Sequence, residues 1–115
     1  ALLKVDGSGF TALPIAEKAT ELGDDLITIG TPADVDLGQS IAKGVLSGNR
    51  KVDEQRYLQI NLAISPGNSG GPLLNDKGEV VGVIQSKLVG EAIEGIGFAL
   101  PIEETLKSVG VQMVE

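Results

Sequence analysis

The residues with the clearest chemical potential lie in the stretch 65–74, SPGNSGGPLL, around a single serine, Ser69. Hydrophobic segments flank this stretch on both sides, which indicates a tight loop inside a folded domain. Gly67, Gly70 and Gly71 allow φ angles that are closed to other residues. A sharp turn of this kind can hold a serine hydroxyl outward and direct two backbone N–H groups at one point. Acyl transfer requires that pair of features, a nucleophile and an oxyanion hole.

Two other interpretations fit the same residues. Positions 67–71 also match Gly-x-Ser-x-Gly, the nucleophile elbow of α/β-hydrolases, which requires a helix directly after the serine. Pro72 and the turn residues 75–78 follow instead, so the context is strand–loop–strand and argues against the elbow. The remaining interpretation is a glycine-rich hairpin turn with an incidental serine.

Length and composition indicate one small all-β domain. The chain has 115 residues, of which 42% are hydrophobic, 3% aromatic and 16 glycine, and its apolar segments are short and rich in Val, Ile and Leu. The net charge of −7 disfavours nucleic acid and anionic membrane surfaces as partners. The chain contains no cysteine and no apolar run near the roughly 20 residues of a membrane span. We expect no metal and no cofactor, and a first residue other than Met suggests part of a longer protein.

Apolar alternation and turn residues predict a small antiparallel barrel. We expect strands near 1–5, 26–30, 39–47, 57–64, 79–86 and 96–100, a candidate bulge at Gly44, a polar loop over 48–51 and a hairpin turn over 75–78. The interval 10–25 reads as a connection with one or two helical turns between Ile15 and Leu22, so residues 1–25 are separated from a barrel unit spanning 26–115. The predicted core consists of Ile29, Val45, Leu62, Val81, Val83, Ile84 and Phe98.

A C-terminal helix is predicted over residues 102–109. Pro101 suits its first position, and Gly110 suits its end. Ile102, Leu106 and Val109 fall on one face at i, i+4 and i+7, so this face should pack on the barrel.

The serine stretch resembles the active-site loop of trypsin-like serine proteases of the bacterial HtrA (Deg) branch, Asn-Pro-Gly-Asn-Ser-Gly-Gly-Pro-Leu, and departs from it only at Ser65. Similar collinear matches occur at 26–32, 38–47, 78–83 and 96–101, so the resemblance runs over nearly the whole chain. It implies the second, C-terminal Greek-key barrel of a trypsin-like double barrel. Ser69 would be the nucleophile, and the N–H groups of Gly67 and Ser69 would form the oxyanion hole. Asn61 departs from the family's usual aspartate.

The trypsin-type base is histidine, and this sequence contains none. In the family, the histidine and aspartate belong to the first barrel, and residues 1–5 resemble the end of its last strand. Lysine serves as base in unrelated serine peptidases, but Lys77 and Lys87 show no sign of burial. The resemblance therefore implies three partners: a polypeptide substrate, a missing N-terminal barrel with His and Asp, and a second copy when the chain is alone. The family likeness suggests the bacterial periplasm or cell envelope.

The family alignment also places an uncharged substrate pocket, which implies a preference for small or branched apolar P1 residues such as Val or Ala. Its predicted wall consists of Ala63, Ile64, Val83, Ile84, Gln85, Ile96 and Gly97. A competing function from another class is a catalytically silent trypsin-fold barrel used for peptide binding or assembly. A plain structural domain is a third reading, and it leaves the Ser69 stretch unexplained.

Overall fold

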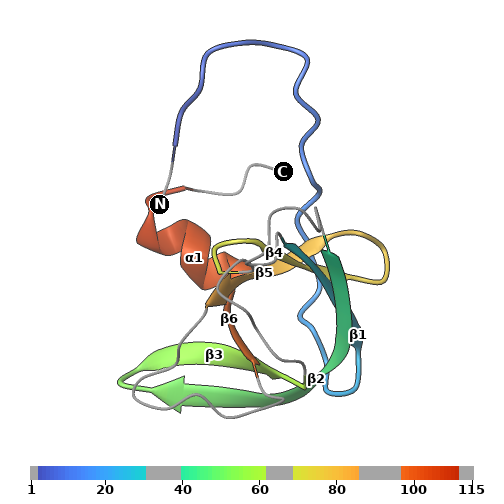
Figure 1. The fold of residues 1–115 in the computed structure, drawn as a ribbon. Helices are drawn as coiled ribbons and strands as arrows, with labels where there is room; N and C mark the ends of the chain where they lie inside the picture. Colours follow the sequence, from blue (N-terminus) through green and yellow to red (C-terminus); the bar gives the residue numbers. More distant parts are fainter. Residues whose placement is uncertain (1–2, 31–39, 62–68, 86–96, 112–115) are drawn as a thin grey trace.

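A computed structural model describes residues 3–30, 40–61, 69–85 and 97–111. These residues form a closed antiparallel barrel of six strands in the order β1-β2-β3-β6-β5-β4, followed by one short helix (Figure 1). The elements are β1 (Asp25–Gly30), β2 (Ser40–Val52), β3 (Gln55–Ile60), β4 (Pro72–Asn75), β5 (Val80–Gln85), β6 (Gly97–Pro101) and α1 (Ile102–Ser108). The predicted all-β barrel with a C-terminal helix is confirmed.

Successive side chains of a strand point to opposite faces, so every second residue of each strand points into the barrel and contributes to its core. The buried cluster draws on every strand and on the N-terminal segment: Ala16, Leu26, Leu46, Leu58, Ile60, Leu73, Val81, Ile84 and Ala99.

The predicted core is partly right. Val81 and Ile84 are buried, as expected. Val45, Val83 and Phe98 are only half-buried, and Leu62 lies outside the described residues. Ile29 was predicted wrongly.

Ile29 is exposed because Leu26 and Thr28 take the inward positions of β1. That alternation sends Ile29 to the outer face with 37% of its surface exposed, beside its cross-strand neighbour Ile41. A continuous apolar run in the sequence therefore does not mean that both faces of a strand are buried.

Strand β2 is longer than the sequence suggested, since the predicted loop over 48–51 is part of the β2–β3 hairpin. The two strands remain paired from Leu46 to Val52, and the turn is made by Asp53 and Glu54. Both turn residues have positive φ, 50° and 69°. The bulge predicted at Gly44 is wrong, because Gly44 pairs regularly with Leu26, and the irregularity of β2 is a register shift against β3 between Leu46 and Gly48.

The N-terminal segment has neither of its predicted elements. Residues 3–5 are not in a strand, and 15–22 contain no helical turn. Instead, Val80 donates to the Pro14 carbonyl and accepts from the Ala16 amide, at 2.8 and 3.0 Å, in an isolated parallel bridge. This backbone pairing replaces the helix that the side-chain spacing suggested.

Before Pro14, the N-terminal arm (residues 3–13) leaves the barrel as an open arc (Figure 1). Its apolar side chains are largely exposed, with Leu3 at 83% and Phe10 at 71%. Apolar residues in an extended segment without covering contacts indicate a surface that another polypeptide can cover.

Helix α1 begins directly after Pro101, which is the N-cap rather than the first helical residue. It ends in a Schellman arrangement: Gly110 has φ +75° and donates to the Lys107 carbonyl, while Val111 donates to the Leu106 carbonyl. The predicted helix and its glycine stop are confirmed. None of the described residues belongs to a helix long and apolar enough to span a membrane.

The contact face of α1 is half-buried rather than buried, and a polar contact adds to it. Ile102, Leu106 and Val109 are all of intermediate exposure. The Glu104 carboxylate accepts a 2.6 Å hydrogen bond from the Gln55 side-chain amide and lies 3.8 Å from the Arg56 guanidinium. The helix is thus tied to the start of β3 as well as to β5 and β6.

Gly82→Ala should destabilise the barrel. A Cβ at Gly82 would lie 2.7 Å from the Leu100 carbonyl oxygen, a backbone atom that cannot move independently. We expect a loss of about 1–3 kcal/mol in the free energy of unfolding, measured by urea denaturation. Gly48→Ala is the matched control, because its Cβ would meet nothing closer than 3.6 Å. Equal effects of the two substitutions would contradict the tight packing at Gly82.

Glu54→Gly should stabilise the β2–β3 hairpin. Glu54 holds a φ of 69°, which is strained for a residue with a Cβ, and glycine removes that strain. Glycine is also more flexible in the unfolded chain, which offsets part of this stabilisation. We expect a net increase of up to about 1 kcal/mol in the free energy of unfolding. Glu54→Ala keeps the Cβ and should give no gain. A melting midpoint lowered by the glycine variant would show that the turn is not strained.

Candidate active site

The position of Ser69 is fixed by the strands that follow it. Ser69 and Gly70 form a turn that leads into β4, and both are exposed. The Gly70 amide donates to the Ile84 carbonyl at 2.8 Å, and the Ile84 amide donates to the Gly71 carbonyl at 2.9 Å. Two glycines thus lie opposite one residue of β5, as in a β-bulge. Gly70 has φ +85°, so glycine is required for this turn.

The other end of the serine loop is held by Asn61, directly after β3. Its side-chain oxygen accepts from the Val45 amide at 2.8 Å, and its own amide donates to the Val45 carbonyl at 3.2 Å. Asn61 thereby extends the pairing between β3 and β2 by one residue. An aspartate carboxylate could accept the same bond, so this contact does not account for the departure from the family's aspartate.

Two of the predicted site residues, Gln85 and Gly97, lie at the same end of the barrel as Ser69. Gln85 ends β5 and Gly97 begins β6, and these strands pair, with Gln85 opposite Phe98. Because β5 holds Gly70 through Ile84, the end of β5 and the start of β6 lie at the same end of the barrel as Ser69.

The structure describes four of the residues predicted to form the pocket wall, Val83, Ile84, Gln85 and Gly97. Gly97 is buried, while Val83 and Gln85 are half-buried and lie on the outer face of β5. Ile84 is 2% exposed, and its side chain belongs to the barrel core. Any contribution of Ile84 to a pocket would therefore come from its backbone. The other predicted site residues, Ala63, Ile64, Gly67 and Ile96, lie outside the described residues.

The feature that sequence reasoning missed is the state of the Gln85 side chain. Its Oε1 atom is buried and accepts no hydrogen bond from the residues that the structure describes. A buried acceptor without a donor costs about 1–3 kcal/mol. The family alignment named Gln85 only as part of a wall. Only the packed structure shows that its amide oxygen is buried without a donor.

No base for Ser69 comes from the described part of the chain. The sequence has no histidine. Lys77 is exposed and sits in the β4–β5 turn, at the far end of β4 from Ser69. Lys87 lies outside the described residues. Within the described ranges, no group of Asp and Glu side chains could hold a metal ion.

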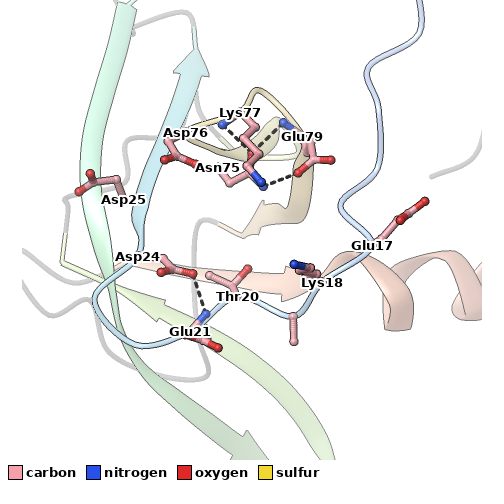
Figure 2. Close-up of a pocket in the computed structure, with 11 residues that line it drawn as sticks. Glu17, Lys18, Thr20, Glu21, Asp24, Asp25, Asn75, Asp76, Lys77 and Glu79 are labelled. Atoms are coloured by element: carbon pink, nitrogen blue, oxygen red, sulfur yellow. Dashed lines mark hydrogen bonds between the residues drawn. The ribbon is translucent and has the colours of Figure 1, made fainter.

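A polar cavity of about 430 Å³ lies away from the serine, between the segment 17–25 and the β4–β5 turn (Figure 2). Six carboxylates line it: Glu17, Glu21, Asp24, Asp25, Asp76 and Glu79. Some of these are used structurally. Asp24 accepts from the Glu21 amide, and Asn75 binds Glu79 and shapes the turn (Figure 2). The cavity is at the opposite end of β4 from Ser69, so it is not part of the same site.

The sequence matches a known protein family. Residues 1–83 match the family model of the trypsin-like peptidase domain. Serine protease Do-like HtrB of Bacillus subtilis is 31% identical over all of this chain and 31% of its own length. Serine endoprotease DegS of Escherichia coli K12 is 36% identical over 93% of this chain and 33% of its own. The chain thus spans about a third of the length of the curated relatives it matches.

Solved structures agree with the sequence relatives. A serine endoprotease from Yersinia pestis superposes with a TM-score of 0.76 at 34% identity, covering 92% of this chain and 37% of that one. An HtrA-type protease with a decapeptide gives a TM-score of 0.78 at 26% identity, covering 92% and 34%. The chain therefore belongs to the trypsin-like peptidase domain family and, within it, to the HtrA/Deg group of serine proteases.

Proposed function

We propose that this chain is the nucleophile-bearing half of an HtrA-like serine endopeptidase, which hydrolyses peptide bonds through an acyl-enzyme. The observation that carries the proposal is the turn at Ser69. An exposed serine is held by a glycine bulge against β5, beside the paired ends of β5 and β6. An incidental surface serine does not require a positive φ at Gly70 and a backbone clamp to the neighbouring strand.

In this mechanism, Ser69 Oγ attacks the carbonyl carbon of the scissile peptide bond. A histidine from the other half accepts the serine proton, and the backbone N–H groups of Gly67 and Ser69 bind the oxyanion. The same histidine then protonates the leaving amine, and water hydrolyses the acyl-enzyme. This chemistry uses no metal and no organic cofactor.

The histidine and its aspartate would come from an N-terminal barrel that precedes Ala1 in the intact protein. Two observations support this arrangement. The chain covers about a third of its relatives' length, and the apolar N-terminal arm (residues 3–13) is exposed where a preceding domain would connect. By the family pattern, an aspartate should lie two residues before Ala1.

Substrate preference follows from the uncharged pocket that the family alignment places beside Ser69. Val83 and Gly97 supply no charge, so the intact enzyme should prefer small or branched apolar P1 residues over Lys or Arg. A hydrophobic pocket discriminates by only about 1–3 kcal/mol per methylene, which makes the preference broad.

The second candidate function is a catalytically silent barrel that binds peptides or supports assembly. The absence of histidine from the sequence favours it. The upstream gene sequence separates the two: a histidine and an aspartate there support the protease, and the lack of both supports the silent barrel.

The 115-residue chain alone should be inert, because a serine without a base is a poor nucleophile. We expect poor labelling of Ser69 by a fluorophosphonate probe and no peptide hydrolysis. Adding the upstream half, fused or in trans, should restore both. Ser69→Ala should abolish them, whereas Ser108→Ala, a matched change on the exposed end of α1, should leave them intact. Labelling that survives Ser69→Ala would refute the assignment of the nucleophile.

The isolated chain should also self-associate through its N-terminal arm. The arm's exposed apolar residues and its extended, irregular course invite pairing with a second copy. Sedimentation velocity should show a dimer or larger species whose share rises with concentration. Removing residues 1–13 should shift the population towards monomer and leave the barrel folded. A monomer at all concentrations before truncation would contradict this expectation.

A further inference from the structure

We propose that Thr28 is a positioning residue for Ser69: its buried hydroxyl holds the first residue of β4, and through it the turn that carries the serine. The inference rests on the proposed function, since it concerns the reaction of Ser69 with peptides. It assigns a role in that reaction to a core residue of β1, which lies outside the predicted site.

The first step is the burial of the Thr28 side chain. Thr28 is 0% exposed, and among the residues that the structure describes it is the only buried one with a polar side chain. Leu26, the preceding inward residue of β1, and Leu73, its cross-strand neighbour on β4, are also fully buried. A valine has the same shape and needs no hydrogen-bond partner, so filling the core does not by itself account for a threonine here.

The second step is the atom that the hydroxyl binds. Thr28 Oγ1 donates to the Pro72 carbonyl oxygen at 3.2 Å. Pro72 begins β4, and proline has no N–H, so its carbonyl is the only hydrogen-bonding group of its backbone. The bond joins residues that are 44 positions apart in the sequence, and it ties the start of β4 to β1.

The third step is the short connection from Pro72 back to the serine. Only Gly70 and Gly71 separate the two residues, and Ile84 of β5 binds both glycines, at 2.8 and 2.9 Å. Strand β4 lies between β1 and β5 in the barrel, so the Thr28 bond holds this segment from the side opposite to Ile84. Because glycine imposes few conformational preferences of its own, these contacts on two sides determine where Ser69 lies.

The consequence for the reaction follows from the geometry of nucleophilic attack. Without the Thr28 bond, the start of β4 can shift while every residue of the serine turn keeps its identity. The rate depends on the distance and angle between Ser69 Oγ and the scissile carbonyl carbon, and a displacement of about 1 Å can cost about 100-fold. An interaction that acts only on the transition state changes kcat and leaves KM nearly unchanged.

The test measures peptide hydrolysis by the full-length protein and two variants of Thr28. Thr28→Val keeps the shape of the side chain and removes its hydroxyl, and we expect kcat to fall about tenfold while KM stays within about twofold. Thr28→Ser keeps the hydroxyl and removes a core methyl group, so it should lower the melting midpoint and keep kcat within about twofold of the unmodified value. An unchanged kcat in Thr28→Val, or an equal loss of kcat in both variants, would overturn the proposal.

Thr105→Val is the matched control, because the Thr105 hydroxyl also donates to a proline carbonyl, that of Pro101, at 2.9 Å. This bond lies at the start of α1, at the other end of β6 from Gly97. Thr105→Val should therefore leave kcat unchanged. A fall in kcat as large as that of Thr28→Val would show that the loss does not depend on the contact with the serine turn, and would overturn the inference.

Hydrogen exchange separates this inference from the proposed function. If the unmodified protein cleaves no peptide, the protease proposal fails, and the role of Thr28 is read from the turn itself. The Gly70 amide donates to the Ile84 carbonyl, so its deuterium exchange, resolved by mass spectrometry in the full-length protein, reports how firmly the turn is held. Exchange at Gly70 that is about tenfold faster in Thr28→Val and unchanged in Thr105→Val supports the role of Thr28. Equal exchange in Thr28→Val and the unmodified protein overturns it.

Discussion

The closure of the barrel between β1 and β4 is the contact on which the rest of the structure depends. Thr28 is fully buried, and its hydroxyl donates to the Pro72 carbonyl at 3.2 Å while the two strands pair at Thr28 and Leu73. A buried hydroxyl is tolerated only when it is bonded, so this contact fixes the register at the start of β4. That start lies three residues after Ser69. The serine's place is therefore set by the same pairing that closes the core.

The contacts at the end of the serine loop come from the backbone rather than from side chains. Gly70 and Gly71 bind Ile84 through amides and carbonyls, and Gly70 adopts a φ that only glycine accepts readily. The position of Ser69 is thus set by the backbone contacts of the glycines that follow it.

Sequence patterns succeeded where local chemistry determines structure. The 75–78 turn, the helix after Pro101 and its end at Gly110 were predictable because each depends on residues adjacent in the chain. Sequence patterns failed where pairing between strands decides the structure of residues whose types suggest a loop. The polar residues at 48–51 look like a loop, yet β3 holds them in β2 through a turn with positive φ at Asp53.

The site shows the same division. The turn at Ser69 was predictable from its glycine neighbours, because a tight turn with positive φ at Gly70 needs that residue type, while the role of Ser69 as nucleophile stays a prediction. Two features of the site depend on tertiary packing and were not predictable. They are the burial of the Ile84 side chain in the barrel core and the burial of the Gln85 side-chain oxygen. The irregular N-terminal arm was not predicted, because whether an apolar segment forms a strand depends on a partner strand, which local sequence does not reveal. A strand signal without a partner then gives an exposed, irregular segment.

The barrel core and the turn that holds Ser69 meet at β5. The core cluster contains no site residue other than Ile84, which enters it by its side chain and meets the serine loop by its backbone. Ile84 thus connects core packing to the turn from β5, as the buried Thr28 does at the start of β4. A change in the volume of the Ile84 side chain would displace the β5 backbone that holds Gly70, so a core substitution here would misplace Ser69 although Ser69 and the glycines after it were unchanged.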